Sequence, residues 1–193
     1  MSGLDRREAV GRLLANRSPD LLVVTGLGSP TYDAMAAGDS DRNFYLWGAM
    51  GGAAMVGLGL AKAQPQKSVL VLTGDGEAMM GLGSLATIAV QRPTNLSIVV
   101  LDNGRFGETG MQASHTGLGV EIDRVAASLG FAWTESIDDL AAIDRLRERI
   151  AARAGAGLAV VRIKAENPPR VLPSRDCVHL KTRFRAALGF QPG

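Results

Sequence analysis

Short runs of apolar residues alternate along the chain with longer segments of mixed character. Each run has the length of a strand buried on both faces, and each mixed segment has the length of a helix. This alternation indicates the α/β class, with a doubly wound, mostly parallel sheet and helices on both faces. We predict strands at 20–25, 44–47, 68–73, 96–101, 131–134 and 158–163. We predict helices at 5–16, 30–37, 50–63, 82–91, 121–129, 137–154 and 177–188.

The segment 50–63 departs from the amphipathic pattern, because it is apolar on almost every side. A helix of that kind is expected to be buried. It also contains Gly51, Gly52, Gly57 and Gly59, and a helical glycine costs about 1 kcal/mol relative to alanine. We infer that these glycines allow close approach of another backbone or of a cofactor.

Length and composition limit the kinds of protein that this chain can be. With 193 residues, 46% of them hydrophobic, we expect one domain over 1–193 with a basic tail from about residue 166. A net charge of +2 and 5% aromatic residues argue against a nucleic-acid surface. The apolar runs are too short for a membrane span, and residues 1–7 lack the apolar core of an export signal. The single cysteine, Cys177, excludes an internal disulfide and a cysteine-ligated cluster, so we expect a cytoplasmic protein.

Two predicted strands end in the same kind of sequence. The run 68–73 leads into Gly-Asp-Gly at 74–76, and the run 96–101 leads into Asp-Asn-Gly at 102–104. Ligands of open α/β sheets bind at the carboxyl ends of parallel strands, so we expect Asp75 and Asn103 to lie side by side there. Their oxygens suit Mg²⁺, and the flanking glycines let backbone N–H groups close on phosphate oxygens. The alternative is an Asx-turn at each strand end, with no ligand.

A glycine turn, Gly26-Leu27-Gly28-Ser29, follows the first predicted strand. Pro30 comes next, and proline is favourable in the first turn of a helix. By itself this turn is either a tight strand-to-helix connection or a second phosphate-binding turn. A glycine-rich, polar segment at 104–119 is predicted to be a loop over the site.

The spacing of these motifs resembles the thiamine diphosphate motif, a GDG followed downstream by an asparagine. Residues 43–51, 56–61, 101–110 and Gln112 also resemble segments of sulfopyruvate and phosphonopyruvate decarboxylases. The resemblance covers about residues 20–165 and the tail weakly. On this basis the chain is identified as a member of the thiamine diphosphate-dependent 2-oxo acid decarboxylases. It is most similar to sulfopyruvate decarboxylase β subunits and also resembles the C-terminal domain of phosphonopyruvate decarboxylase.

The resemblance implies two cofactors, thiamine diphosphate and Mg²⁺. The implied metal ligands are Asp75, Asn103 and the backbone carbonyl of Arg105. Gly76 and Glu77 would offer backbone N–H groups to the diphosphate at the positive end of a short helix, with the Glu77 side chain turned away. Family members often have asparagine where Gly26 stands, so one side-chain contact would be missing here. The implied cofactor-binding residues are Gly26, Leu27, Gly28, Ser29, Gly48, Met50, Gly74, Asp75, Gly76, Glu77, Asn103, Arg105, Phe106, Gly107, Glu108 and Thr109.

Three residues are candidates for a direct part in catalysis. In the family a bulky apolar side chain wedges between the two cofactor rings, and a carbonyl two residues earlier accepts a hydrogen bond from the 4′-amino group. Met50 and the carbonyl of Gly48 match those positions; the alternative is a core methionine at a helix start. His115 is the only histidine near the predicted loop and would move a proton or bind an anion, although a lone loop histidine is more often solvated.

The family also needs a glutamate that activates the aminopyrimidine, and it comes from a separate pyrimidine-binding domain. This chain resembles only the diphosphate-binding half, so we expect a hetero-oligomer in which an α subunit supplies that glutamate. The glycine-rich helix at 50–63 is the expected interface element. The chain should then bind cofactor weakly and catalyse little by itself.

The implied reaction converts 3-sulfopyruvate to sulfoacetaldehyde and CO₂. Phosphonopyruvate or another 2-oxo acid is the first alternative, because the motifs bind cofactor and not substrate. A ferredoxin-coupled oxidoreductase subunit, a carboligase and a non-catalytic cofactor-binding subunit are the others. The basic tail (Arg170, Arg175, Lys181, Arg183 and Arg185) is either a solvated amphipathic helix, which we favour, or a set of cations for a sulfonate or phosphonate.

Overall fold

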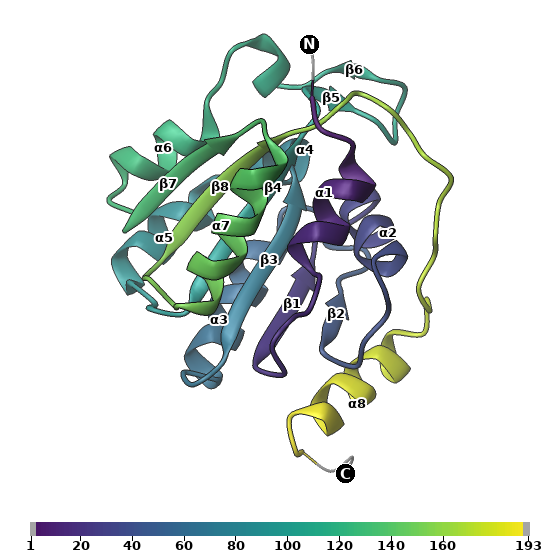
Figure 1. Ribbon diagram of the computed structural model, residues 1–193, viewed down its shortest axis with the longest axis vertical. Helices are drawn as coiled ribbons and strands as arrows, with labels where there is room; N and C mark the ends of the chain where they lie inside the picture. The colour runs from purple at the N-terminus through teal and green to yellow at the C-terminus, as the bar shows by residue number, and fades with distance from the viewer. Residues whose placement is uncertain (1–2, 191–193) are drawn as a thin grey trace.

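A six-stranded sheet, with every strand parallel to its neighbours, forms the centre of the computed structural model, which describes residues 3–190 (Figure 1). The strand order is β2-β1-β3-β4-β8-β7, and the two central strands are almost wholly buried, as their continuous apolar sequences predict. The strands are β1 (Leu21–Thr25), β2 (Asn43–Tyr45), β3 (Ser68–Gly74), β4 (Leu96–Asp102), β7 (Trp133–Ile137) and β8 (Gly157–Arg162).

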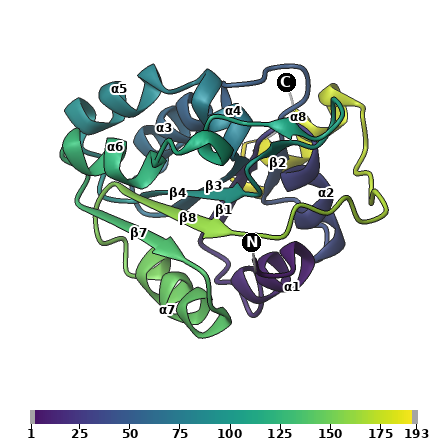
Figure 2. The ribbon, with the colours of Figure 1, turned by 90° about the horizontal axis from the view of Figure 1, so that it is seen from above.

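Helices cover both faces of this sheet, which confirms the predicted doubly wound α/β class. Helices α1, α2 and α7 pack on one face, and α3, α5 and α6 pack on the other (Figure 2). The helices are α1 (Arg6–Leu13), α2 (Ser29–Ala36), α3 (Ala53–Ala63), α4 (Asp75–Met80), α5 (Gly83–Gln91), α6 (Ile122–Ser128), α7 (Leu140–Ala151) and α8 (Cys177–Ala187). None of them, within residues 3–190, is long and apolar enough to cross a bilayer.

The connections from β1 create the place where a ligand can bind. β1 and β3 are neighbours, but the connection after β1 leads to β2 on one side and the connection after β3 leads to β4 on the other side. A crevice forms at such a switch point, outside the carboxyl ends of the two strands. The predicted glycine turn follows β1, and the Gly-Asp-Gly sequence follows β3, so both lie at this crevice.

Several predicted boundaries need correction. The second strand ends at Tyr45, without Leu46 and Trp47. The strand predicted at 131–134 is displaced to β7, so Ile137 is buried in a strand and does not begin the next helix. The predicted loop at 104–119 contains a short hairpin, β5 (Arg105–Phe106) with β6 (Gln112–Ala113), and one turn of 3₁₀ helix at Thr116–Leu118.

The predicted burial of the segment 50–63 is wrong for the chain as described. Helix α3 begins only at Ala53 and buries one side, through Ala53, Gly57, Leu58 and Ala61. Gly57 fits against the sheet, because a Cβ there would lie 2.2 Å from a methyl group of Val71. The opposite side of the helix stays exposed at Met55, which keeps 42% of its full accessible surface, and Met50, just before the helix, keeps 43%. An apolar face left open in this way is typical of a surface that another protein covers.

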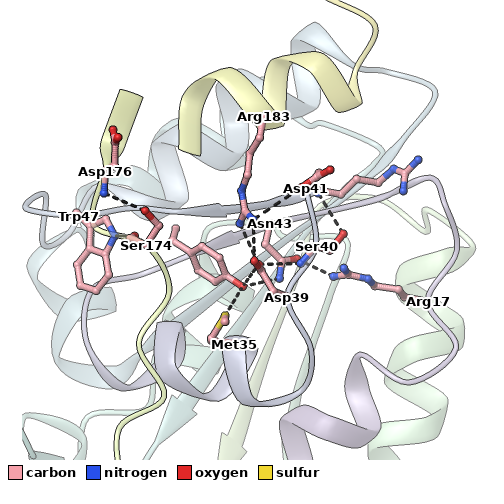
Figure 3. Close-up of polar contacts among 12 residues, drawn as sticks. Arg17, Met35, Asp39, Ser40, Asp41, Asn43, Trp47, Ser174, Asp176 and Arg183 are labelled. Atoms are coloured by element: carbon pink, nitrogen blue, oxygen red, sulfur yellow. Dashed lines mark hydrogen bonds and ion pairs between the residues drawn. The ribbon is translucent and has the colours of Figure 1, made fainter. Parts of the chain in front are cut away.

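The C-terminal helix α8 is held by buried contacts and is not a freely solvated helix. It buries Leu180 and Phe184, and Arg183 forms two hydrogen bonds, of 2.7 and 2.9 Å, with the carboxylate of Asp39 (Figure 3). The hydroxyl of Tyr45 donates to the same carboxylate at 2.9 Å. Arg183 is therefore a structural arginine, whereas Arg175, Lys181 and Arg185 are exposed.

Candidate functional site

A cleft of about 250 Å³ opens at the switch point between β1 and β3. Its walls come from the turn after β1, the end of β3 with the start of α4, and the segment that follows β4. Most residues of the predicted cofactor site line it, so the fold brings together segments that are far apart in sequence. These residues are Leu27, Gly28, Ser29, Met50, Gly74, Asp75, Gly76, Glu77, Asn103, Arg105, Phe106, Gly107, Glu108 and Thr109.

The turn after β1 directs the start of α2 into the cleft. Gly28 precedes the helix with a φ of +78°, a conformation that favours glycine. The hydroxyl of Thr31 fixes the turn, since it donates to the carbonyl of Gly26 at 2.7 Å and lies 2.6 Å from the hydroxyl of Thr25. Gly28 and Ser29 line the cleft at the start of α2, so the positive end of the helix dipole lies there, which favours an anion.

Asp75 opens α4 at the end of β3 and is almost completely buried. Its carboxylate accepts hydrogen bonds from the hydroxyls of Ser114 and Thr116. Burial raises the pKa of Asp75, the hydrogen bond from Ser114 opposes that shift, and the nearby charge of Asp102 adds to it. No lysine or arginine in residues 3–190 forms an ion pair with Asp75, so its negative charge lacks a compensating cation within the described chain.

Asn103 and Arg105 follow the adjacent strand β4 and line the same cleft. The side-chain oxygen of Asn103 accepts a hydrogen bond from the backbone N–H of Arg105 at 2.9 Å, so the Asx-turn considered from the sequence is present. An amide oxygen has two lone pairs, and the turn therefore leaves one of them for a ligand. Gly104 has a φ of +66°, which lets the chain reverse immediately after β4.

Sequence reasoning missed the residues that attach the segment after β4 to the site. The hydroxyl of Thr116 lies 2.7 Å from an oxygen of Asp102 and 3.0 Å from an oxygen of Asp75, so its single proton is shared between the two carboxylates. The backbone N–H of Ser114 donates to the carbonyl of Gly104 at 3.0 Å. Arg162 pairs with the other oxygen of Asp102. Serine and threonine within a polar, glycine-rich segment carry no sign of this role, because their partners lie on other strands.

Gly76 has a packing role that its motif does not reveal. A Cβ at this position would lie 2.7 Å from the ring of Phe106 and 3.9 Å from the terminal methyl of Met50. The absent side chain thus allows Phe106 and Met50 to close on the start of α4. Both side chains line the cleft, and they give it an apolar wall opposite the polar turn after β1.

Three predicted residues, Gly26, Gly48 and His115, are not among the described residues that line the cleft. His115 is exposed and lies edge-on to Phe106, with 6.2 Å between the ring centres. Pro30, Leu101, Ile163 and Arg6 line the cleft although they were not predicted. Arg6 is buried and pairs with Asp33 at 2.7 Å, which places a guanidinium beside the turn after β1.

The C-terminal segment also borders the site. Asn167 donates from its side-chain nitrogen to the carbonyl of Gly107 at 3.2 Å. Gly107 itself fits closely, since a Cβ there would lie 3.0 Å from the side-chain oxygen of Asn167. The chain that leaves β8 therefore lies against the segment that lines the cleft after β4.

Residues 35–163 match the family described as thiamine pyrophosphate enzyme, C-terminal TPP binding domain. The chain belongs to this family. The family predicted from the sequence is thereby confirmed, and the match includes the Gly-Asp-Gly turn, the strand β4 and the hairpin after it. Arg6 and the turn after β1 lie outside the matched residues.

Two sulfopyruvate decarboxylase subunits are similar to this chain over most of its length. The sulfopyruvate decarboxylase subunit beta of Methanothermobacter thermautotrophicus is 42% identical over 137 residues, which cover 71% of this chain and 72% of that protein. The subunit of the same name from Methanococcus maripaludis is 30% identical over 190 residues, 96% of this chain and 98% of that protein. A phosphonopyruvate decarboxylase of Streptomyces hygroscopicus is 43% identical, but the match covers only 34% of its length.

Solved structures support the same fold. The thiamine diphosphate-dependent 4-hydroxybenzoylformate decarboxylase of Rhodococcus jostii RHA1 superposes with a TM-score of 0.70 at 19% identity. The superposition covers 87% of this chain and 34% of that enzyme. The chain thus corresponds to about one third of such an enzyme, and at this identity the likeness concerns the fold alone.

Proposed function

We propose that this chain is the diphosphate-binding β subunit of a thiamine diphosphate-dependent 2-oxo acid decarboxylase, with 3-sulfopyruvate as substrate and sulfoacetaldehyde and CO₂ as products. The observation that carries the proposal is the convergence of the turn after β1, Asp75 and Asn103 on one cleft. This convergence occurs in a chain similar to sulfopyruvate decarboxylase β subunits over most of its length. The anionic substrate and the aldehyde product are taken from those relatives.

The cleft residues divide into those that hold the cofactor and those that shape it. The N–H groups beside Gly28 and Ser29, at the start of α2, and those of Gly76 and Glu77 would bind the diphosphate. Met50 would stand between the two rings, and the carbonyl of Gly48 would accept a hydrogen bond from the aminopyrimidine. When bound, thiamine diphosphate supplies the carbanion donor and the electron sink for decarboxylation. The apolar wall with Phe106 excludes water from the reacting carbon.

Mg²⁺ fits the residues at the ends of β3 and β4. A buried carboxylate without a cationic partner, an amide oxygen and a backbone carbonyl form the oxygen-only set that this ion prefers. Asp75, Asn103 and the carbonyl of Arg105 would hold it, with the diphosphate oxygens completing its coordination. The ion would also supply the positive charge that the Asp75 carboxylate lacks within the described chain.

A separate α subunit completes this site in our proposal. The carboxylates that line the cleft among residues 3–190 belong to Asp75, Glu77 and Glu108, and the first two are buried at the diphosphate end. The cofactor-activating glutamate must then come from another chain. Met50, Met55 and Met80 are exposed, and the backbone of Met80 packs against Gly51, so an apolar surface borders the cleft. We assign this surface to the α subunit, and we propose a cytoplasmic location for the complex.

The test is CO₂ release from 3-sulfopyruvate with Mg²⁺ and thiamine diphosphate. The chain is assayed alone and together with the product of its neighbouring reading frame, with phosphonopyruvate and pyruvate as comparison substrates. We expect activity only in the mixture and only with 3-sulfopyruvate. Turnover by the chain alone would contradict a site shared with the α subunit. A preference for phosphonopyruvate would contradict 3-sulfopyruvate as the substrate.

A further inference from the structure

Glu77 occupies a buried position where several parts of the site meet. Its side chain is 4% exposed, and its Oε2 atom accepts a hydrogen bond from the hydroxyl of Thr73 at 2.9 Å. The backbone N–H groups of Leu27, Gly51 and Ala53 also face the carboxylate. Glu77, on α4, thus connects the end of β3 with the turn after β1 and with the segment at 51–53.

The second carboxylate oxygen is the unusual feature. Oε1 of Glu77 is buried and has no partner of ordinary hydrogen-bond geometry among the described residues. A buried carboxylate oxygen without a hydrogen bond is unfavourable, and the N–H groups of Leu27, Gly51 and Ala53, which face the carboxylate, are the nearby donors. The free-energy cost of burying Glu77 is therefore smallest when these three segments stay close to its carboxylate.

Gly26 shows how tightly the carboxylate is enclosed. A Cβ at Gly26 would lie 1.6 Å from Oε2 of Glu77 and 2.6 Å from its carboxyl carbon. The φ of Gly26 lies outside the left-handed region, so its backbone does not demand glycine. The Glu77 carboxylate fills the space in which a side chain at position 26 would stand, and Gly26 accordingly faces Glu77 and not the cleft.

We propose that Glu77 is a positioning residue, whose carboxylate holds the turn after β1 and the segment at 48–53 at the spacing that the cofactor cleft requires. The proposal rests on the proposed function for the identity of the cofactor. Leu27 lines the cleft beside Gly28, and Gly51 adjoins Met50, so these two contacts of Glu77 lie at or next to residues that line the cleft. One side chain thereby couples the turn after β1 to the segment that carries Met50.

The first experiment follows hydrogen exchange of the backbone amides of Leu27, Gly51 and Ala53 in the full chain without cofactor. We expect Glu77→Ala to speed exchange of these amides about tenfold, the factor that corresponds to about 1.4 kcal/mol. Glu77→Gln, which keeps the shape, should give a smaller increase and serves if Glu77→Ala does not fold. Glu148→Gln, an exposed glutamate on α7, is the matched control. Unchanged exchange at these amides in both Glu77 variants would overturn the proposal.

The second experiment uses the clash at Gly26. Thiamine diphosphate affinity with Mg²⁺ is measured for Gly26→Ala, for Glu77→Ala and for the double variant, each with the partner subunit present. We expect Gly26→Ala to weaken binding at least tenfold in the native background and much less in Glu77→Ala, because the carboxylate is then absent. Equal losses in both backgrounds would contradict the proposal. If the native complex binds no thiamine diphosphate, the proposed function fails, whereas the exchange experiment still decides the role of Glu77.

Discussion

Arg170 and Glu108 form an ion pair of 2.6 Å that links the C-terminal segment to the segment lining the cleft after β4. The two residues are 62 positions apart, and the Arg170 guanidinium also lies over the ring of Tyr32 on α2, 5.6 Å from its centre. Glu108 lines the cleft, so this contact connects the tail to the cofactor site without Arg170 itself lining the cleft. The favoured interpretation of the tail as solvated is wrong for Arg183, which is 14% exposed, whereas Arg170 is 59% exposed and combines solvation with this contact.

We expect Arg170→Ala to raise the concentration of thiamine diphosphate needed for half-maximal activity by about threefold, because a partly exposed ion pair contributes about 0.2–1 kcal/mol. The maximal rate and the melting temperature should change little. Arg175→Ala, an exposed arginine of the same tail, is the control. An equal effect of both variants would mean that overall tail charge, and not this contact, determines cofactor affinity.

Asp75→Asn should abolish Mg²⁺-dependent cofactor binding while leaving the chain folded. Asparagine keeps a carbonyl oxygen for Ser114 and Thr116, but it removes the charge that a divalent cation needs. We expect a loss of about 100-fold in thiamine diphosphate affinity, in the upper part of the range for changes around a bound metal. Calorimetric titration with thiamine diphosphate, with and without Mg²⁺, measures this loss. A thiamine diphosphate affinity that still depends on Mg²⁺ would rule out Asp75 as a ligand of the ion.

Met50 offers a test of the ring wedge, because its side chain is 43% exposed and contributes little to the core of the chain. Met50→Ala should lower the turnover rate of the assembled enzyme about tenfold or more, while Met50→Leu, which keeps the bulk, retains most of it. Met55→Ala changes a methionine of nearly equal exposure that does not line the cleft. This control therefore distinguishes an effect on subunit assembly from an effect on the chemical step. Normal turnover by Met50→Ala would leave the residue as an interface methionine only.

The contact between Asp39 and Arg183 predicts a pH-dependent stability. Hydrogen bonds from Arg183 lower the pKa of Asp39 to about 2, from an ordinary value of 3.8. A carboxyl group with a depressed pKa in the folded chain stabilises it above the unfolded value, and this contribution disappears as the pH falls from about 4 to about 2. Asp39→Asn should therefore cost about 1 kcal/mol at pH 7 and progressively less below pH 4.

Thermal unfolding of the native chain and Asp39→Asn at pH 7, 5, 4 and 3 measures this difference. Asp41→Asn is the control, since Asp41 is 70% exposed and lies 3.7 Å from Arg183. A difference in melting temperature that stays constant from pH 7 to pH 3 would show that the Asp39 charge does not stabilise the docked helix α8.

The sequence by itself determined the class of fold and most of the motifs that meet at the cleft. Continuous apolar strands such as β3 and β4 are buried on both faces in almost any α/β arrangement, so their runs identify them without tertiary information. Gly-Asp-Gly after β3 and Asp-Asn-Gly after β4 meet because adjacent parallel strands end at one edge of the sheet. The helix starts at Asp5 and Asp176 are likewise local, since each carboxylate caps the helix that follows it.

Only the tertiary structure decided which side chains support that cleft. Ser114 and Thr116 bind Asp75 across about 40 residues of chain, which no local pattern encodes. Gly26 and Gly76 are both glycines of turns that follow a strand, and the sequence does not distinguish their roles. Gly26 makes room for the carboxylate of Glu77, whereas Gly76 makes room for the ring of Phe106. Only the structure shows which side of α3 is exposed, because an apolar sequence does not distinguish burial within a chain from burial against the partner that this segment was expected to contact. In each case the deciding contact is between residues distant in sequence, so packing alone determines it.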